Sequence, residues 1–158
     1  MFTLASSSMA CKTELDVEAK SSADKMWEAI RMSAQLFPKI FPEEYESIEI
    51  VEGDGKSAGT IRLLKYAPEV KILTFAKERI DLVDDEKKHV SYTVIDGEIM
   101  NLYKTFKATL KVEGKGEGSV VKWCIDYEKA SEEVPDPDPF KEVAAKTFSH
   151  LDEYLCQN

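Results

Sequence analysis

The sequence predicts an α+β fold in which a curved antiparallel sheet of seven strands wraps around a long C-terminal helix. Three observations favour this fold. The N-terminal part changes from a strand pattern to a helical pattern, the middle of the chain reads as six consecutive strands, and the last part is an amphipathic helix. Because a strongly curved sheet does not meet a helix along its whole length, the same fold predicts an internal cavity between them.

The N-terminal region contains one predicted strand and two predicted helical segments. Residues 13–20 alternate between apolar and mostly acidic side chains, which is typical of a half-buried strand. Ser21-Ser22-Ala23-Asp24 resembles a capping box, and apolar residues then recur at helical spacing up to Phe37-Pro38. The proline predicts the end of this helix, and residues 39–44 are expected to form a second short helical turn.

The rest of the chain reads as strands followed by one helix. Short polar turns such as Asp96-Gly97 separate the strands, so neighbours in sequence are expected to pair as antiparallel hairpins. The expected strands are residues 45–52, 60–66, 72–83, 89–96, 100–113 and 119–129. After a proline-rich segment at residues 134–139, residues 140–156 form an amphipathic helix. Its apolar stripe consists of Phe140, Val143, Ala144, Thr147, Phe148, Leu151 and Leu155.

Length and charge restrict the functions that this chain can have. Its 158 residues predict a single domain over residues 11–158, after a loose N-terminal tail at residues 1–10. The formal net charge of −9 disfavours nucleic acid and anionic lipid as partners. No apolar stretch reaches the length of about 18 residues that a membrane span needs, and the N-terminus lacks the features of a secretion signal. We therefore expect a cytoplasmic protein that is by default a monomer.

The cysteines predict neither a disulfide framework nor a metal site. Cys11, Cys124 and Cys156 are odd in number and widely separated, whereas disulfide-rich domains and zinc sites use closely spaced sets. We expect reduced thiols, and we predict no cofactor and no metal.

The glycine-rich segment 53–62 is the most distinctive motif in the chain. Its spacing, G-x-G-x-x-x-G, differs from the dinucleotide-binding fingerprint, and a predicted strand follows where that fingerprint requires a helix. A Walker loop is disfavoured because Lys56-Ser57 lies between the second and third glycines. We interpret the segment as a β-connection that needs positive φ angles and close backbone approach, with a phosphate site as the alternative.

The order of the elements and several short motifs resemble the plant major latex proteins, a branch of the birch pollen allergen superfamily with the helix-grip fold. The resemblance extends from about Thr13 to Leu155. It is carried by the glycine-rich segment together with Lys20-Ser21-Ser22-Ala23-Asp24-Lys25, Tyr103-Lys104-Thr105-Phe106-Lys107-Ala108-Thr109, Val121-Lys122-Trp123, Tyr127-Glu128-Lys129-Ala130, and Lys146-Thr147-Phe148 with Leu151-Asp152-Glu153-Tyr154-Leu155. It implies a cytosolic plant protein whose large hydrophobic cavity carries apolar small molecules, linked to defence, stress or development.

Together with strand parity, this resemblance implies which side chains face the cavity. Arg62, Glu78 and Lys104 are expected inside it, as an ion network that fixes the sheet, as groups that bind the polar end of a ligand, or as catalytic groups. The same parity places Leu82 and Leu102 on inward faces. The expected ligand-binding residues are Trp27, Ile30, Arg62, Leu64, Tyr66, Ala76, Glu78, Ile80, Val90, Tyr92, Val94, Lys104, Phe106, Ala108, Phe148 and Leu151.

One alternative is open in this assignment. In the strand at 119–129, either Trp123 and Tyr127 or the alternate set of Lys122, Cys124 and Asp126 faces inward.

The segments expected to gate the entrance are the glycine-rich segment and residues 66–73 and 135–140, because they have little regular structure.

Some proteins with this fold are enzymes, notably norcoclaurine synthase, whose cavity uses a tyrosine, a glutamate, a lysine and an aspartate. The resemblance matches the glutamate at Glu78, whereas the tyrosine position falls at Ala76, the lysine at Val90 and the aspartate at Ala108 or Thr109. Without the lysine, that mechanism lacks its proton donor and acceptor. The alternative function is therefore a different cavity enzyme, a lyase or isomerase for an alkaloid-like or terpenoid substrate, with Glu78 as its base.

Other activities of the superfamily fit less well. The Ser-Gly-Leu-Pro-Ala gate and His-Arg-Leu latch of the abscisic acid receptors are absent from the sequence. Asp152 and Tyr154 lie near the carboxylate and tyrosine invoked for ribonuclease activity, but the two histidines, His89 and His150, offer no clear acid and base pair. We therefore predict a non-catalytic carrier or sensor of small hydrophobic ligands of steroid, fatty acid, phenolic or hormone type.

Overall fold

The computed structural model describes residues 12–157, which form one antiparallel sheet of seven strands and four helices. The elements follow the order β1 (Thr13–Ala19), α2 (Ala23–Arg31), α3 (Ser33–Ile40), β2 (Tyr45–Glu52), β3 (Ile61–Tyr66), β4 (Phe75–Asp84), β5 (His89–Gly97), α4 (Ile99–Leu102), β6 (Tyr103–Lys115), β7 (Gly118–Lys129) and α5 (Asp138–Gln157). This architecture confirms the predicted fold class. The expected tail at residues 1–10 and Cys11 lie outside the described residues.

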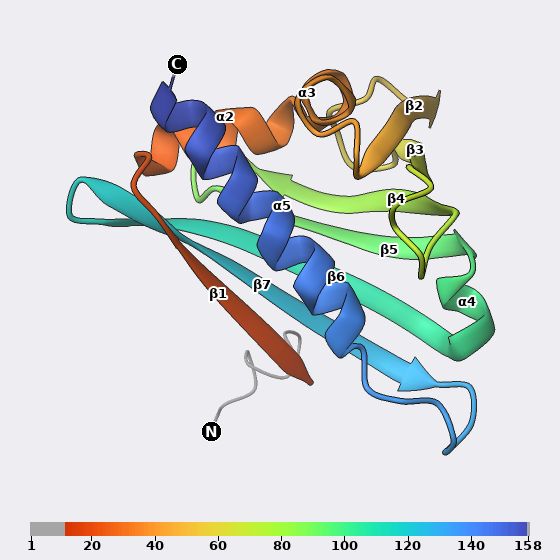
Figure 1. Ribbon diagram of the computed structural model, residues 1–158. Helices are drawn as coiled ribbons and strands as arrows, with labels where there is room; N and C mark the ends of the chain where they lie inside the picture. The colour runs from red at the N-terminus through yellow and green to blue at the C-terminus, as the bar shows by residue number, and fades with distance from the viewer. Residues whose placement is uncertain (1–11, 158) are drawn as a thin grey trace.

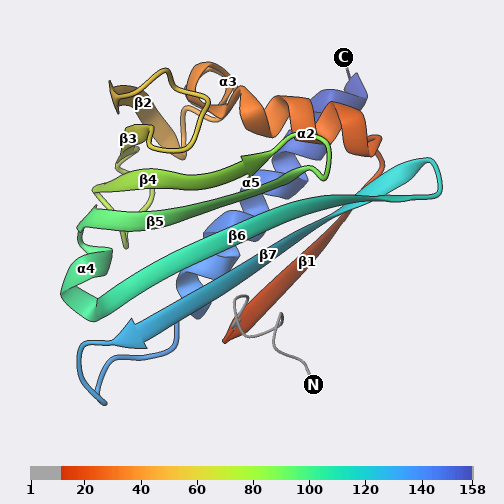
Figure 2. The same cartoon turned by 180° about the vertical axis from the view of Figure 1, so that it is seen from behind.

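The sheet has the strand order β1-β7-β6-β5-β4-β3-β2, so every strand from β2 to β7 pairs with its neighbour in sequence. Figure 1 shows α5 crossing one face of the sheet diagonally, with α2 and α3 across one end. Figure 2 shows that no helix of the described chain covers the opposite face. The core lies between the sheet and α5, where Met26, Tyr103, Val121, Ile125 and Leu151 are fully buried.

The first predicted helix is divided in two. The Ser22 side chain caps α2 by accepting a hydrogen bond from the Lys25 N–H at 3.2 Å, as the capping motif predicts. The break falls at Met32, which has φ −100° and ψ 18°, outside helical geometry. Pro38 lies inside α3, so the prediction that it ends the helix is wrong. A helix tolerates this proline because its fixed φ is helical, at the cost of one backbone hydrogen bond.

Two irregularities change the strand parity. A register shift between Ile80 and Leu82 turns the Leu82 side chain outward, where it is 43% exposed. Residues 99–102 form the short helix α4 instead of the start of a strand, and β6 shifts register between Tyr103 and Thr105. As a result Tyr103 points inward and Lys104 outward. The expectations for Leu82, Leu102 and Lys104 are therefore wrong.

The orientation of β7 is settled by its burial pattern. Val121, Trp123 and Ile125 are buried, whereas Lys122 is exposed on the opposite face. Cys124 is disulfide-bonded, so the expectation of a reduced thiol is wrong at this position, while Cys156 is a free thiol.

Candidate functional site

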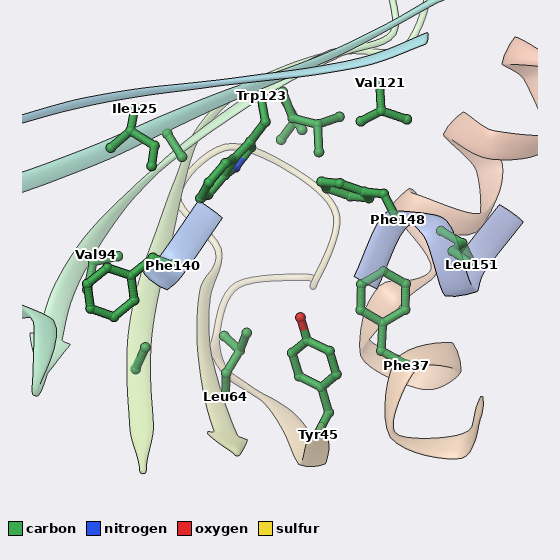
Figure 3. Close-up of a cluster of buried hydrophobic side chains, with 14 of the residues drawn as sticks. Phe37, Tyr45, Leu64, Val94, Val121, Trp123, Ile125, Phe140, Phe148 and Leu151 are labelled. Carbon is green, nitrogen blue, oxygen red and sulfur yellow. The ribbon is translucent and has the colours of Figure 1, made fainter. Parts of the chain in front are cut away.

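An internal cavity of about 140 Å³ lies between the sheet and α5. The sheet forms one wall, α5 the opposite wall, and the ends of α2 and α3 close one side. Figure 3 shows Tyr45 pointing its hydroxyl toward Trp123 and Phe148, which come from β7 and α5. The lining residues are Ile30, Arg31, Ser33, Phe37, Tyr45, Ile48, Gly55, Arg62, Leu64, Tyr66, Leu73, Ala76, Glu78, Ile80, Val90, Tyr92, Val94, Ile99, Phe106, Leu110, Trp123, Phe140, Val143, Ala144, Thr147 and Phe148.

Most of the side chains expected in this site do line the cavity. They are Ile30, Arg62, Leu64, Tyr66, Ala76, Glu78, Ile80, Val90, Tyr92, Val94, Phe106 and Phe148. Strand parity finds them because the side chains alternate regularly from Ala76 to Ile80 in β4 and from Val90 to Val94 in β5, although the pairing of these two strands shifts register at Lys77/Glu78 and again after Ile80.

Four expected residues lie elsewhere. Ala108 and Leu151 are fully buried in the core but do not line the cavity. The Trp27 indole N–H donates to Asp85 Oδ1 at 3.0 Å, so this side chain closes the end of the molecule near α2. The Lys104 side chain is 61% exposed and its Nζ lies 3.6 Å from Glu128 Oε2, so it takes no part in a cavity ion network.

The charged pair inside the cavity is Arg62 and Glu78. These residues face each other across β3 and β4, and Arg62 Nη2 donates to Glu78 Oε1 at 2.9 Å. Arg62 Nη1 also donates to Ser33 Oγ at 2.7 Å, which ties the start of α3 to the sheet. The two side chains are only 17% and 8% exposed, so each charge depends on the other for compensation.

Three tyrosines surround this ion pair. Burial is the main cause that raises the pKa of Tyr45, Tyr66 and Tyr92, and the nearby Glu78 carboxylate raises each pKa further. All three phenols therefore stay protonated at physiological pH and can donate hydrogen bonds. The Tyr92 hydroxyl accepts a bond from the Trp123 indole N–H at 3.0 Å.

A second polar group sits where α5 meets the loop before β2. Thr147 Oγ1 donates to Glu44 Oε2 at 2.7 Å and lies 3.1 Å from the Tyr45 hydroxyl. Glu44 is buried, and its other oxygen lies 3.5 Å from Nδ1 of the half-exposed His150. His150 therefore contacts a buried carboxylate.

Several lining residues were missed from the sequence. Phe140, Val143, Ala144 and Thr147 belong to the apolar stripe of α5, and that stripe was the available signal. Leu110 and Trp123 follow from the parity of β6 and β7 once one residue of each strand is oriented. Ser33, by contrast, reaches the site only because of the unpredicted break at Met32.

The glycine-rich segment binds its own aspartate. Asp54 Oδ1 accepts from the Lys56 and Ser57 N–H groups at 2.7 and 2.8 Å, and these bonds lower the pKa of Asp54. Its three glycines have φ between 86° and 93°, and a Cβ on Gly53 would lie 2.9 Å from the Cα of Thr60. The interpretation as a β-connection is therefore confirmed, and the amides that a phosphate would need are occupied by a carboxylate.

The cavity is bordered near this segment by Arg31 at the end of α2. Its Nε donates to Asp85 Oδ1 at 3.1 Å and its Nη2 donates to the Lys56 carbonyl at 2.8 Å. Arg31 thus links three parts of the chain, namely α2, the glycine-rich segment and the turn between β4 and β5.

Asp152, considered above for ribonuclease chemistry, has a structural role. Its carboxylate accepts hydrogen bonds from the N–H groups of Lys20 and Ser21, both at 2.9 Å, and from the Ser21 hydroxyl at 2.6 Å. Burial raises the pKa of Asp152, but these hydrogen bonds outweigh burial, so the pKa is lowered overall. The residue fixes the connection from β1 to α2 against α5.

The fold and this apolar cavity can be compared with known proteins. A model of the pathogenesis-related protein Bet v 1 family matches residues 8–158. The chain belongs to this family. Proteins of the family bind small hydrophobic ligands. This match confirms the resemblance to the birch pollen allergen superfamily that was predicted from the sequence.

Within the Bet v 1 family the chain is similar to major latex proteins. It is 43% identical to MLP-like protein 423 of Arabidopsis thaliana over 143 residues, which is 90% of this chain and 92% of that protein. The crystal structure of ginseng major latex-like protein 151 from Panax ginseng matches with a TM-score of 0.82 and 26% identity. The match covers 90% of this chain and 95% of that one.

Norcoclaurine synthase from Thalictrum flavum is a more distant structural neighbour. Its structure matches with a TM-score of 0.72 and 25% identity over 96% of this chain and 92% of that one. Glu78 and Val90 both line the cavity here, so the position matched to the synthase lysine holds an apolar side chain. Among the described residues, no lysine lines the cavity.

Two further features bear on function. None of the described helices is long and apolar enough to cross a membrane. In the part of the chain that the structure describes, no group of three or more acidic, histidine or cysteine side chains is arranged to hold a metal.

Proposed function

We propose that this protein is a non-catalytic carrier or sensor that holds one small hydrophobic molecule in the cavity between the sheet and α5. The observation that carries the proposal is an internal space with mostly apolar walls and one compact polar region around Arg62 and Glu78. Burial of apolar ligand surface supplies roughly 25 cal/mol per Å², less the cost of ordering the ligand. The polar region around Arg62 and Glu78 orients the ligand.

Family membership and the printed names of relatives support the same proposal. Ligand binding is general in the Bet v 1 family, and the similar sequences are major latex proteins. We also propose that the protein is linked to plant defence or stress responses and that it acts as a monomer.

Native mass spectrometry of protein purified gently from its own tissue tests the carrier function. We expect a mass above that of the chain that is released on activation as a discrete apolar compound. A mass equal to the bare chain, with no displacement of a bound fluorescent dye by sterols, fatty acids or phenolics, would contradict the proposal.

A cavity enzyme is the second candidate function. The likeness to norcoclaurine synthase and the position of Glu78 in the cavity favour it. In a lyase or isomerase with Glu78 as base, Glu78→Gln would abolish turnover and retain substrate affinity. A carrier has no turnover to lose. Assays of wild type and variant with alkaloid-like and terpenoid substrates therefore distinguish the two functions.

We also propose a cytoplasmic location. The disulfide at Cys124 is the observation against it, because cytosolic proteins rarely keep structural disulfides. Fractionation of the source tissue followed by immunodetection tests the location, and a signal confined to the secreted fraction would contradict it.

A further inference from the structure

The ion pair in the cavity is more than an apolar carrier needs. Arg62 and Glu78 face each other across β3 and β4, whereas the next inward pair along the same strands, Leu64 and Ala76, is apolar. Apolar residues in place of a buried ion pair often leave a fold equally or more stable. The pair therefore points to a role in selecting the ligand.

The charges that line the cavity are already compensated. Arg62 binds Glu78 at 2.9 Å, and Arg31, at the border of the cavity, binds Asp85 at 3.1 Å. Glu44 adds a further buried carboxylate behind Tyr45. An anionic ligand would find no unpaired cation among these residues, and its charge would lie beside the Glu78 carboxylate in a site with little water. That arrangement disfavours a carboxylate.

The groups in the site that remain available for hydrogen bonds are one acceptor, the Glu78 carboxylate, and several donors beside it. Glu78 Oε1 is occupied by Arg62, and within residues 12–157 no side chain donates to Glu78 Oε2. The buried Arg62 Nε–H also has no acceptor there, so Arg62, which lines the cavity, keeps one donor free. The hydroxyl of Tyr66 makes no hydrogen bond to a described residue either, and the Tyr92 hydroxyl accepts from Trp123 but donates to no described residue. Both tyrosines and Glu78 line the cavity. A hydroxyl group that donates to Glu78 and accepts from a tyrosine fits this set.

We propose that the cavity selects an uncharged, mostly apolar molecule with a hydroxyl group at one end, and that Glu78 and the neighbouring tyrosines bind this hydroxyl. The inference rests on the proposed carrier function and narrows its ligand class. It favours an alcohol or phenol over a fatty acid with the same skeleton.

Three matched probes test this selectivity on the full chain. Decan-1-ol, its methyl ether and decanoate share an alkyl chain but present a hydroxyl, an ether oxygen and a carboxylate, and each is titrated against protein loaded with the neutral dye Nile red. The alcohol should displace the dye at a concentration at least about tenfold lower than the ether, because only the alcohol can donate to the carboxylate. Decanoate should be the weakest of the three.

Two variants separate recognition by Glu78 from the general cost of burying a carboxylate. Glu78→Gln leaves the Arg62 charge uncompensated, so decanoate should gain about tenfold while the alcohol loses its advantage over the ether. Tyr66→Phe removes one hydroxyl with little change of shape and should weaken both the alcohol and the ether severalfold, because both oxygens can accept from this hydroxyl, while the advantage of the alcohol over the ether is kept. If Glu78→Gln does not fold, as judged by circular dichroism, Tyr66→Phe tests whether the ligand oxygen lies beside these groups, and unchanged binding of both probes would contradict the inference.

The outcomes distinguish this inference from the carrier function. If none of the three probes displaces the dye, the carrier function itself fails. If the alcohol and the ether bind equally well, or decanoate binds the wild type most tightly, the carrier function stands and the inferred selectivity is overturned.

Discussion

Thr147 shows how one side chain joins the cavity to the rest of the fold. It lies on α5, donates to the buried Glu44 and contacts the Tyr45 hydroxyl, which belongs to β2. His150 Nδ1 lies 3.5 Å from the other carboxylate oxygen, so among the described side chains only Thr147 donates to Glu44 Oε2. A buried carboxylate without its donor is costly.

We predict that Thr147→Val lowers the free energy of unfolding by about 2–3 kcal/mol, because valine keeps the shape but leaves Glu44 without its donor. Urea unfolding followed by tryptophan fluorescence measures the change. Thr147→Ser is the matched control, because it keeps the hydroxyl and loses one methyl group. Equal losses in the two variants would show that packing and not the hydrogen bond matters here.

Asp152 gives a prediction with a defined pH dependence. Its pKa in the folded state lies below the ordinary value of 3.8, so its contribution to stability is complete above that value and is lost as the pH falls through the folded pKa. Asp152→Asn should therefore lower the free energy of unfolding by about 1–2 kcal/mol at neutral pH, and by less at about pH 3.

Urea unfolding of the Asp152 variant and wild type at both pH values provides the measurement. Glu153→Gln, at the adjacent exposed position on α5, removes the same charge without these hydrogen bonds and should have little effect. A loss for Asp152→Asn that is independent of pH would argue against the assigned role.

At the scale of elements, α2 is held over the end of the cavity by Asp85. This carboxylate accepts from Trp27 and from Arg31, although the Asp85 side chain is 68% exposed. Exposed contacts of this kind contribute little to stability but can hold an element in place. We infer that α2 opens more readily when Asp85 is removed.

Asp85→Ala should accelerate both association and dissociation of Nile red severalfold, with a smaller change in its dissociation constant. Stopped-flow fluorescence measures both rates. The control is Glu86→Ala, which removes a neighbouring exposed carboxylate without these contacts. Unchanged rates in Asp85→Ala would place the entrance elsewhere, for example between α5 and the β3–β4 connection.

The elements also show what can be predicted from sequence. Turn chemistry located the strands to within a few residues, and parity placed Ala76, Glu78 and Ile80 correctly because β4 is regular in that stretch. Lys104 was misplaced because α4 is too short to show a period, and the register shift after Tyr103 resets the alternation. Such shifts arise from tertiary pairing, which local patterns do not contain.

At the scale of the whole molecule, the curvature of the sheet and the position of α5 determine the cavity. The apolar stripe of α5 predicted its contact with the sheet, but the same stripe is equally compatible with a filled core. Whether Phe140, Val143 and Ala144 pack against β-strand side chains or line an open space depends on the separation of helix and sheet. Sequence periodicity does not encode that separation.

The central claim is that apolar molecules bind inside this cavity, and filling the cavity tests it most directly. Ala144→Trp places an indole in the cavity wall of α5, whereas Ser149→Trp adds the same group on the exposed side of that helix. The measurement is a Nile red fluorescence titration of wild type and both variants, with circular dichroism to establish folding. We predict that Ala144→Trp weakens binding at least about tenfold and that Ser149→Trp binds like wild type. Equal binding by all three folded proteins would contradict the account.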